Sequence, residues 1–476
     1  MANETNPGYL VQLQSPEGDN VYPMVTADGI VGNSGLGSGS VINMTFESVF
    51  VGQTWTLTDG TDDTYTGTVD ESLSASVVVK KINTTYTLSA ALSQKTYTTE
   101  VATSEYYTTL SVLLNCDNVF GVCWDTSNSS TALTRLTPST DPYGLVTRSV
   151  TTEPVPAVGT GAGSSPFDSF MPWSGMKECN LNNAGVVTAW KGDSGFSRSN
   201  NFTMVFIPEF YVATKRDGTK QYFYVSDKPK TGMAKHPGSG KYVGRYTIPG
   251  SKTGVTPTAN VSRATARSNA KKNGDKWRMY DFATYCAIIF LYIVEFADWN
   301  SQNKIAYGRA NEPLTFVTSG NTDMMVYHTG TGGSRISDDT AACQYRWIEN
   351  LWGNIGQWID GFNVNVDTAY YCLNPSEYAD DTTTGYNKIG TLPNYGWIKD
   401  LTVTDNGLII PKTVGGSETT YIPDYYSNTD ASYTWTALFV GNKFGTGPGA
   451  GLLGYRTSYM ASMTQKFIST RLICDV

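Results

Sequence analysis

The side chains that most often carry catalysis are scarce in this chain of 476 residues. It has two histidines, His236 and His328, and both stand in loop-like sequence that contains glycine. A metal site built from several histidines is therefore excluded, and a Ser-His-Asp triad would have to use one of these two. An ordinary loop histidine is the favoured interpretation of each.

The cysteines show no spacing that is typical of metal or redox sites. Their number is odd and no pair has CxxC spacing. The seven are Cys116, Cys123, Cys179, Cys286, Cys343, Cys372 and Cys474. Cys286 lies in an apolar helical run, which predicts a small buried residue. We expect no disulfide to be required for folding, because free thiols fit assembly in a reducing cytoplasm.

Two charged clusters would suit a ligand, but each has a simpler interpretation. The acidic pair Asp380-Asp381, preceded by Glu377, offers oxygen ligands for a hard cation, yet it lacks an EF-hand frame and a loop turn is favoured. A basic run would suit an anionic cell-wall polymer, yet its position at an exposed helix start favours a solvated face. It comprises Arg263, Arg267, Lys271, Lys272, Lys276 and Arg278. We therefore predict no metal, no cofactor and no catalytic residue.

Charge and composition restrict the partners. A net charge of −8 and a pI near 5.0 argue against nucleic acid, since phosphate contacts need an excess of Lys and Arg. The charged fraction is only 16%, while Gly 47 and Tyr 30 are high, a mixture typical of short strands with polar turns. Residues 1–7 lack the basic and apolar regions of a secretory signal. The longest apolar stretch, 282–294, is too short to span a bilayer, so no membrane insertion is expected.

The sequence pattern predicts three parts, the first two rich in strands. Residues 1–38 contain a strand at 9–14, a turn at 17–20 and a return strand at 21–25, followed by a Gly- and Ser-rich joint at 32–40. This part has too few apolar positions for a core of its own and needs a partner chain or a docking surface. Residues 39–116 show about seven alternating strands, which predicts a small immunoglobulin-like β-sandwich.

Residues 117–476 form the third predicted part, an α+β domain with many tryptophans. Apolar residues recur at three and four positions in 280–296, which predicts a helix after an interruption of the helical stretch at 273–275. A second helix is predicted over 343–359. Its tryptophans, Trp347, Trp352 and Trp358, are expected to lie mostly in the core.

Several motifs of this third part resemble those of phage proteins. Trp277-Arg278-Met279-Tyr280-Asp281-Phe282 opens a helix, Gly353-Asn354-x-x-Gln357-Trp358 stands downstream, and Thr470-Arg471-Leu472-Ile473 follows late. In this order they resemble the C-terminal domain of phage head-fibre and tail-fibre proteins, which is similar to the formylglycine-generating-enzyme branch of the C-type lectin fold. Residues 9–31 more weakly resemble the opening of phage head-fibre proteins, with Tyr22-Pro23 in a matching place.

The departures from that resemblance concern chemistry. No cysteine lies between Cys372 and Cys474, whereas the oxidising members of the branch carry a late cysteine pair. Neither a Glu-Pro-Asn nor a Gln-Pro-Asp triplet occurs, so calcium-dependent sugar binding is not implied. The resemblance therefore implies a fold and not an activity.

The expected protein is a non-enzymatic virion appendage, assembled in the host cytoplasm and displayed on the virion surface. Residues 1–38 would dock it to a capsid or tail protein and hold a homo-oligomer, a trimer by analogy with fibres. The sandwich would be a spacer, and the C-type-lectin-like domain would bind a host-surface glycan or protein. The candidate contacts are aromatic residues of loop-like segments, Trp397, Tyr425, Tyr426 and Trp435. An enzyme acting on envelope glycans and a purely structural capsid decoration are the alternatives.

Overall fold

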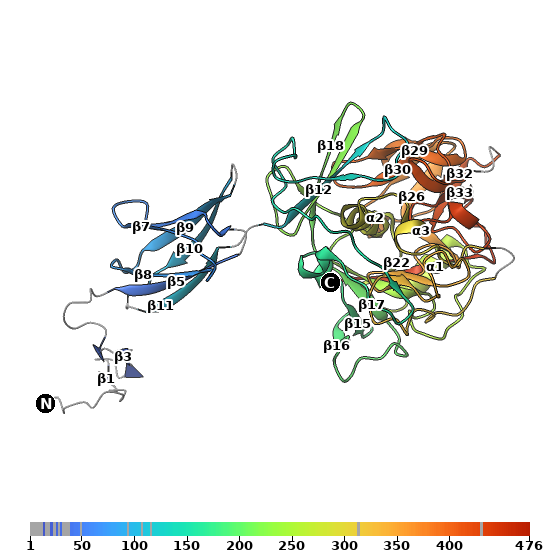
Figure 1. Cartoon of the computed structure of the whole chain (residues 1–476). Helices are drawn as coiled ribbons and strands as arrows, with labels where there is room; N and C mark the ends of the chain where they lie inside the picture. Colours follow the sequence, from blue (N-terminus) through green and yellow to red (C-terminus); the bar gives the residue numbers. More distant parts are fainter. Residues whose placement is uncertain are drawn as a thin grey trace. The chain divides into compact units, whose positions relative to one another are not determined.

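The chain divides into two compact units, which we call the small unit (Met1–Cys116) and the large unit (Asp117–Val476) (Figure 1). The computed structural model describes residues 39–47, 50–92, 95–105, 108–114, 117–311, 315–428 and 432–476, together with four two-residue strands before residue 31. The described part is β-rich, with several sheets and few helices.

The four short strands form two antiparallel pairs. β1 (Leu13–Gln14) pairs with β2 (Asn20–Val21), and β3 (Val25–Thr26) pairs with β4 (Gly29–Ile30). The pairing of β1 with β2 agrees with the predicted strand and return strand. Most of the predicted turn at 17–20 and of the joint at 32–40 lies outside the described residues.

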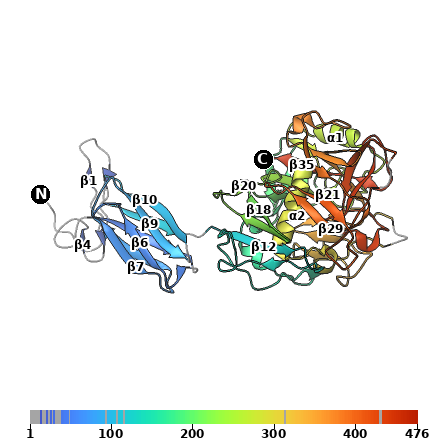
Figure 2. The same ribbon diagram turned by 90° about the horizontal axis from the view of Figure 1, so that it is seen from above.

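Residues 40–114 contain seven strands, in agreement with the prediction of about seven. They are β5 (Ser40–Phe46), β6 (Thr54–Thr58), β7 (Thr64–Thr68), β8 (Ser74–Val79), β9 (Thr85–Leu92), β10 (Lys95–Ala102) and β11 (Thr109–Leu114). One sheet has the order β10-β9-β6-β7, and Figure 2 shows these strands side by side. The other has the order β11-β5-β8. Alternation places Ile42, Met44 and Phe46 in the buried core, while Asn43 and Thr45 between them are more exposed.

The first two sheets of the large unit have five and six strands. The first has the order β13 (Thr134–Arg135), β12 (Val119–Asp125), β19 (Lys220–Ser226), β18 (Tyr211–Asp217) and β20 (Ala234–Lys235). The second has the order β16 (Val187–Trp190), β15 (Glu178–Leu181), β17 (Thr203–Ile207), β21 (Lys241–Thr247), β35 (Arg471–Asp475) and β22 (Trp277–Met279).

Three further sheets complete the large unit. The third has the order β28 (Asn387–Thr391), β27 (Thr368–Tyr371), β26 (Gly356–Asn365), β32 (Trp435–Val440) and β33 (Tyr455–Tyr459), and β34 (Ile468–Ser469) also pairs with β26. The fourth has the order β30 (Ile409–Val414), β29 (Gly396–Val403) and β31 (Ile422–Tyr426). The fifth has the order β14 (Ala157–Val158), β23 (Gly330–Thr331), β24 (Cys343–Tyr345) and β25 (Ile348–Glu349).

The helices confirm the predicted helical stretch and its interruption. α1 (Arg263–Lys271) begins after the N-cap Ser262, and α2 (Phe282–Phe296) begins after Asp281, whose side chain accepts a bond from the Thr284 amide at 2.8 Å. The short α3 (Ser301–Lys304) follows. All 15 residues of α2 are buried, and the helix packs against β12, β19 and β26.

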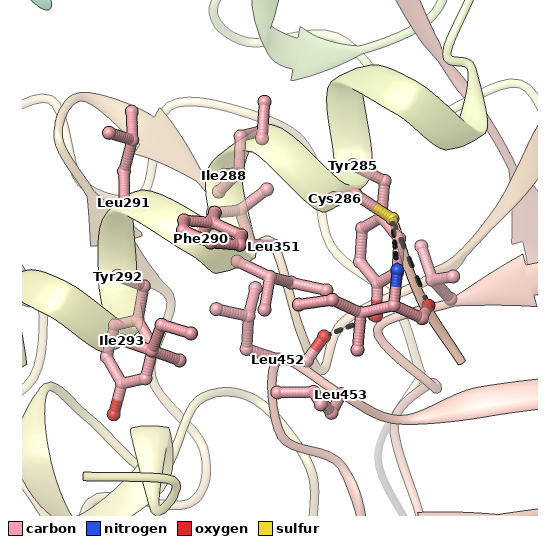
Figure 3. Close-up of a cluster of buried hydrophobic side chains, with 14 of the residues drawn as sticks. Tyr285, Cys286, Ile288, Phe290, Leu291, Tyr292, Ile293, Leu351, Leu452 and Leu453 are labelled. Carbon is pink, nitrogen blue, oxygen red and sulfur yellow. Dashed lines mark hydrogen bonds between the residues drawn. The ribbon is translucent and has the colours of Figure 1, made fainter. Parts of the chain in front are cut away.

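The core around α2 joins distant segments of the large unit (Figure 3). Leu351, Leu452 and Leu453 meet the α2 side chains there. The Tyr285 hydroxyl donates to the Leu452 carbonyl at 2.6 Å, and the Ile409 amide donates to the Cys286 sulfur at 3.4 Å. Cys286 is fully buried, as its apolar helical surroundings predict.

The second predicted helix is wrong, because residues 343–359 form β24, β25 and the start of β26. Five residues there have a left-handed backbone that interrupts any helix: Arg346, Trp347, Asn350, Gly353 and Asn354. Tyr345 pairs with Ile348 across a two-residue turn in which both central residues have positive φ, the geometry of a tight hairpin. Trp352 and Trp358 are fully buried as expected, whereas Trp347 is half-buried.

Candidate functional site

The structure brings together two of the four candidate aromatic residues. Trp397 lies on β29 and Tyr425 on β31, and the two residues are partners across the strand pair. Their rings meet edge to face, with centroids 5.5 Å apart and planes at 87°. Both side chains are half-buried. The prediction that they lie in loops is wrong, since two paired strands hold them and fix their backbone.

The other two candidates lie elsewhere. Tyr426 is fully buried, and its hydroxyl lies 2.8 Å from that of Thr457, so this side chain is part of the core and cannot contact a ligand. Burial raises its pKa to about 12. The reason is strand alternation, which turns Tyr426 inward when its neighbour Tyr425 faces outward. Trp435 is half-buried at the start of β32, opposite Asn365 of β26, and belongs to a different sheet from Trp397.

Sequence reasoning missed two aromatic residues near the pair. Tyr395 is 64% exposed and stands two residues before Trp397. Tyr421 precedes β31, and the Lys399 ammonium lies 5.2 Å from the centre of its ring. The signal for Tyr395 was present in the Pro-Asn-Tyr-Gly-Trp segment that pointed to Trp397. We call Trp397, Tyr425 and Tyr395 the aromatic cluster.

A buried acid stands directly before Tyr425. Asp424 is 1% exposed, and its carboxylate accepts a hydrogen bond from the Leu453 amide at 2.6 Å and another from the Gly451 amide. Burial raises its pKa to about 7. Gly451 has no room for a side chain here, because an added Cβ would lie 1.7 Å from the Asp424 carboxylate. The Asp424 side chain therefore links the 451–453 segment to β31 through these hydrogen bonds.

The two late motifs that carry the resemblance meet in the interior. Arg471 is fully buried, and its Nε donates to the Gln357 side-chain oxygen at 2.5 Å. The same guanidinium donates to the carbonyls of Asn350, at 2.8 Å, and Glu349. The Thr470 hydroxyl donates to the Trp358 carbonyl at 2.9 Å. These residues bind one another and build the framework of the large unit.

The basic run and the acidic pair also meet, so the solvated-face prediction is wrong for part of the run. Arg263 is fully buried and donates to Asp380 at 2.8 Å and to the Asn363 side chain at 2.6 Å. Arg267 holds Asp360 through two bonds of 2.7 Å and reaches Asp380 at 2.6 Å. Burial opposes ionisation of Asp380, but Arg263 and Arg267 outweigh it and lower its pKa.

Both histidines contact neighbouring side chains of the large unit. His236 is fully buried and stacks on Phe210 at 5.1 Å, and burial lowers its pKa to about 3, so it is neutral near pH 7. His328 lies 2.8 Å from the Asp168 carboxylate through Nε2 and 2.8 Å from the Thr329 hydroxyl through Nδ1. Burial and the nearby Arg346 lower its pKa. Both nitrogens of His328 are thus engaged by polar neighbours.

The described ranges contain no group of three or more His, Cys, Asp or Glu side chains arranged to hold a metal ion. The six described cysteines are buried and free, and Cys116 lies outside the described residues. Among helices in the part of the chain that the structure describes, none has the length and apolar character that a membrane span requires.

A cleft of about 300 Å³ opens on the large unit, and its lining includes no residue of the aromatic cluster. It lies between the end of α1, the turn that leads into β22, and the short 3₁₀ helix at Pro375–Glu377. Its lining residues are Lys271, Gly274, Asp275, Trp277, Arg278, Pro375 and Ser376.

No protein-family model matches the chain. No curated protein matches it either. The chain is similar to a solved structure described as "Major Tropism Determinant U1 Variant", at 9% sequence identity and a TM-score of 0.27, over 83% of this chain and 82% of that one. A TM-score of this size does not establish a common fold.

Proposed function

We propose that this protein is a non-enzymatic virion appendage whose large unit binds a ligand on the host surface. The observation that carries the proposal is the aromatic cluster. Two of its rings come from paired strands, and Tyr395 beside them is mostly exposed. Partly exposed aromatic rings on a rigid framework offer apolar faces to sugar rings or partner proteins at a low cost in conformational entropy.

The second part of the proposal is that residues 117–476 are a C-type-lectin-like head. Its support is the sequence resemblance, together with the buried contacts of Arg471 with Gln357 and of Thr470 with Trp358. Buried residues that match the motifs of a family and contact one another can specify a fold without specifying a function. Recognition is then left to surface positions such as those of the aromatic cluster.

The third part concerns assembly. We assign residues 1–38 to docking and oligomerisation on the particle, and the β-sandwich of residues 39–116 to a spacer. A trimer is proposed by analogy with fibres. Several heads on one particle raise the effective concentration of each site, so weak single contacts suffice for adsorption.

The test compares three variants of the full chain for binding to host cells. Trp397→Ala and Tyr425→Ala remove the cluster, and Tyr143→Ala is the matched control, because Tyr143 is also a partly exposed tyrosine that meets another ring edge to face. If the cluster contains binding hot spots, each cluster variant weakens binding by about 2 kcal/mol, or roughly 30-fold. The control should bind normally.

Two results would contradict the proposal. Normal adsorption by a folded Trp397→Ala/Tyr425→Ala double variant would show that the cluster does not bind the host. Release of sugar from purified host envelope by the full chain would show that the protein is an enzyme. Circular dichroism and thermal unfolding of each variant establish whether it is folded.

A further inference from the structure

Arg456 of β33 is a half-buried arginine whose guanidinium has no partner among the residues that the structure describes. Its Nε is buried without an acceptor, whereas its two terminal nitrogens are unpaired and not buried. Burial lowers its pKa, and the groups that oppose this effect are two tyrosines, Tyr459 and Tyr425, rather than a carboxylate. A largely buried charge without a counter-ion is costly, so Arg456 is suited to an anion that comes from outside.

The fully buried arginines of the large unit are satisfied internally, unlike Arg456. Each donates to a buried side chain or to a main-chain carbonyl: Arg245, Arg263, Arg346 and Arg471. Arg456 therefore has no comparable role in holding the framework together.

Strand pairing places Arg456 on the same face as the aromatic cluster. Ser427, which follows β31, forms a parallel bridge with Arg456, and the Thr457 amide donates to the Ser427 carbonyl at 2.9 Å. Bridged residues point to the same side of a sheet, and so do residues two apart on one strand, so Tyr425 and Arg456 share a face. On the opposite, buried face the hydroxyls of Tyr426 and Thr457 meet.

The spacing allows one ligand to contact Arg456 and the aromatic cluster together. Neighbouring strands lie about 4.8 Å apart and two residues on a strand span about 7 Å, so the Cα atoms of Tyr425 and Arg456 are about 8 Å apart. Trp397 is the cross-strand partner of Tyr425 and continues the same surface. A sugar ring that stacks on these side chains can therefore place a charged substituent at the guanidinium.

The donors at this position suit a carboxylate. The two terminal nitrogens of an arginine match the two oxygens of a carboxylate in a planar fork. The hydroxyls of Ser427 and Ser458 are buried and lie 3.4 Å from each other, so they offer no donor for a third oxygen of a sulfate or phosphate. A carboxylate attached directly to a sugar ring also fits the short spacing between Tyr425 and Arg456.

We infer that the ligand of the aromatic cluster is an acidic sugar whose carboxylate binds the terminal nitrogens of Arg456. This inference rests on the proposed function, which assigns host binding to the cluster, and it adds the chemical class of the ligand. The carboxylate supplies the counter-ion that Arg456 lacks, while the rings of Trp397 and Tyr425 contact the sugar.

The test measures binding of the full chain to polysaccharide purified from the host envelope, before and after chemical reduction of its carboxylates to alcohols. Reduction keeps the rings and hydroxyls and removes the charge. We expect the native polysaccharide to bind and the reduced one to bind about tenfold or more weakly, because charged hydrogen bonds are lost.

The outcomes separate this inference from the proposed function. Equal binding of the two polysaccharides would overturn the inference alone, as would loss of binding after removal of phosphodiesters but not after reduction. Binding to intact envelope that protease treatment abolishes would identify a protein ligand and also overturn it. The proposed function fails separately, if Trp397→Ala binds host cells as the wild type does.

Arginine variants establish where the carboxylate binds. Arg456→Gln should bind native polysaccharide about tenfold or more weakly and reduced polysaccharide like the wild type. Arg456→Lys, which keeps the charge but not the fork, should recover only part of the loss. Arg335→Gln is the control, since Arg335 is an exposed arginine between β23 and β24, and should bind both normally.

Thermal unfolding separates a binding role of Arg456 from a structural one. Because its guanidinium has no partner among the described residues, Arg456→Gln should retain or raise the melting temperature. A lower melting temperature would show that Arg456 supports the fold and would overturn the inference. Undiminished binding of native polysaccharide by folded Arg456→Gln would overturn it as well.

Discussion

Asp424 should make the large unit less stable as the pH rises. Burial raises the pKa of this carboxyl from 3.8 to about 7, and no basic side chain donates to it in the described hydrogen-bond network. Between these two pKa values the folded protein holds a proton that the unfolded chain releases, so stability is full below pH 4 and is lost as the pH rises through 7. A shift of about three units corresponds to about 4 kcal/mol.

The change that isolates this effect is Asp424→Asn. The variant cannot ionise, so its unfolding free energy should fall by about 4 kcal/mol less than that of the wild type between pH 4 and pH 8. At pH 4 it should be less stable by about 1–3 kcal/mol, because one of the two backbone amides at Leu453 and Gly451 loses its acceptor. Other buried groups, such as His236, are present in both proteins and cancel in the difference.

Denaturant unfolding followed by tryptophan fluorescence reports on this unit, since Trp55 is the only one of the eleven tryptophans before residue 117. Asp405→Asn, an exposed acid near β30, is the control and should retain the wild-type pH dependence. Identical pH dependence of Asp424→Asn and the wild type would refute the reasoning, because the buried carboxyl would then not be the group that titrates.

Three further predictions concern stability and assembly. Arg471→Met should destabilise the large unit by about 3–5 kcal/mol in denaturant unfolding, because the Gln357 oxygen and several buried carbonyls lose their donor. The described cysteines should resist a thiol reagent in the native protein, and all seven thiols should react after unfolding; recovery of bridged pairs would contradict this. Removal of residues 1–38 should leave a folded chain that no longer assembles, and sedimentation as a trimer would show that the oligomer contacts lie elsewhere.

Local patterns in the sequence predicted the elements that local forces determine. Alternation gave the strands of the small unit, and the apolar period of 280–296 gave α2, whose boundary Asp281 marks as an N-cap. The helix predicted over 343–359 was wrong because the apolar residues of this segment also fit a helical period. Asn350, Gly353 and Asn354, all of which adopt a left-handed backbone, were the available sign of turns.

Contacts between residues that are distant in the sequence, including those of the aromatic cluster, were less predictable. Arg263 and Asp380 are far apart in the sequence, and nothing in either segment indicates their pairing. The aromatic residues around Trp397 in the sequence pointed to it as a candidate. The sequence could not distinguish its partner Tyr425 from the buried Tyr426, because this requires knowing which face of β31 points outward. The Arg278 Nε is buried and has no hydrogen-bond partner in the described structure. This results from packing and could not be predicted from the sequence.

The position of β35 has a consequence for biosynthesis. This strand lies between β21 and β22 and pairs with both, although it comes from residues 471–475. A nascent chain that has reached residue 470 therefore already carries α2, all of whose side chains are destined for burial, but lacks the strand that joins the sheet. We therefore expect β35 to complete the sheet only after its residues have left the ribosome, and a large unit truncated before residue 471 to expose apolar surface and to be prone to aggregation.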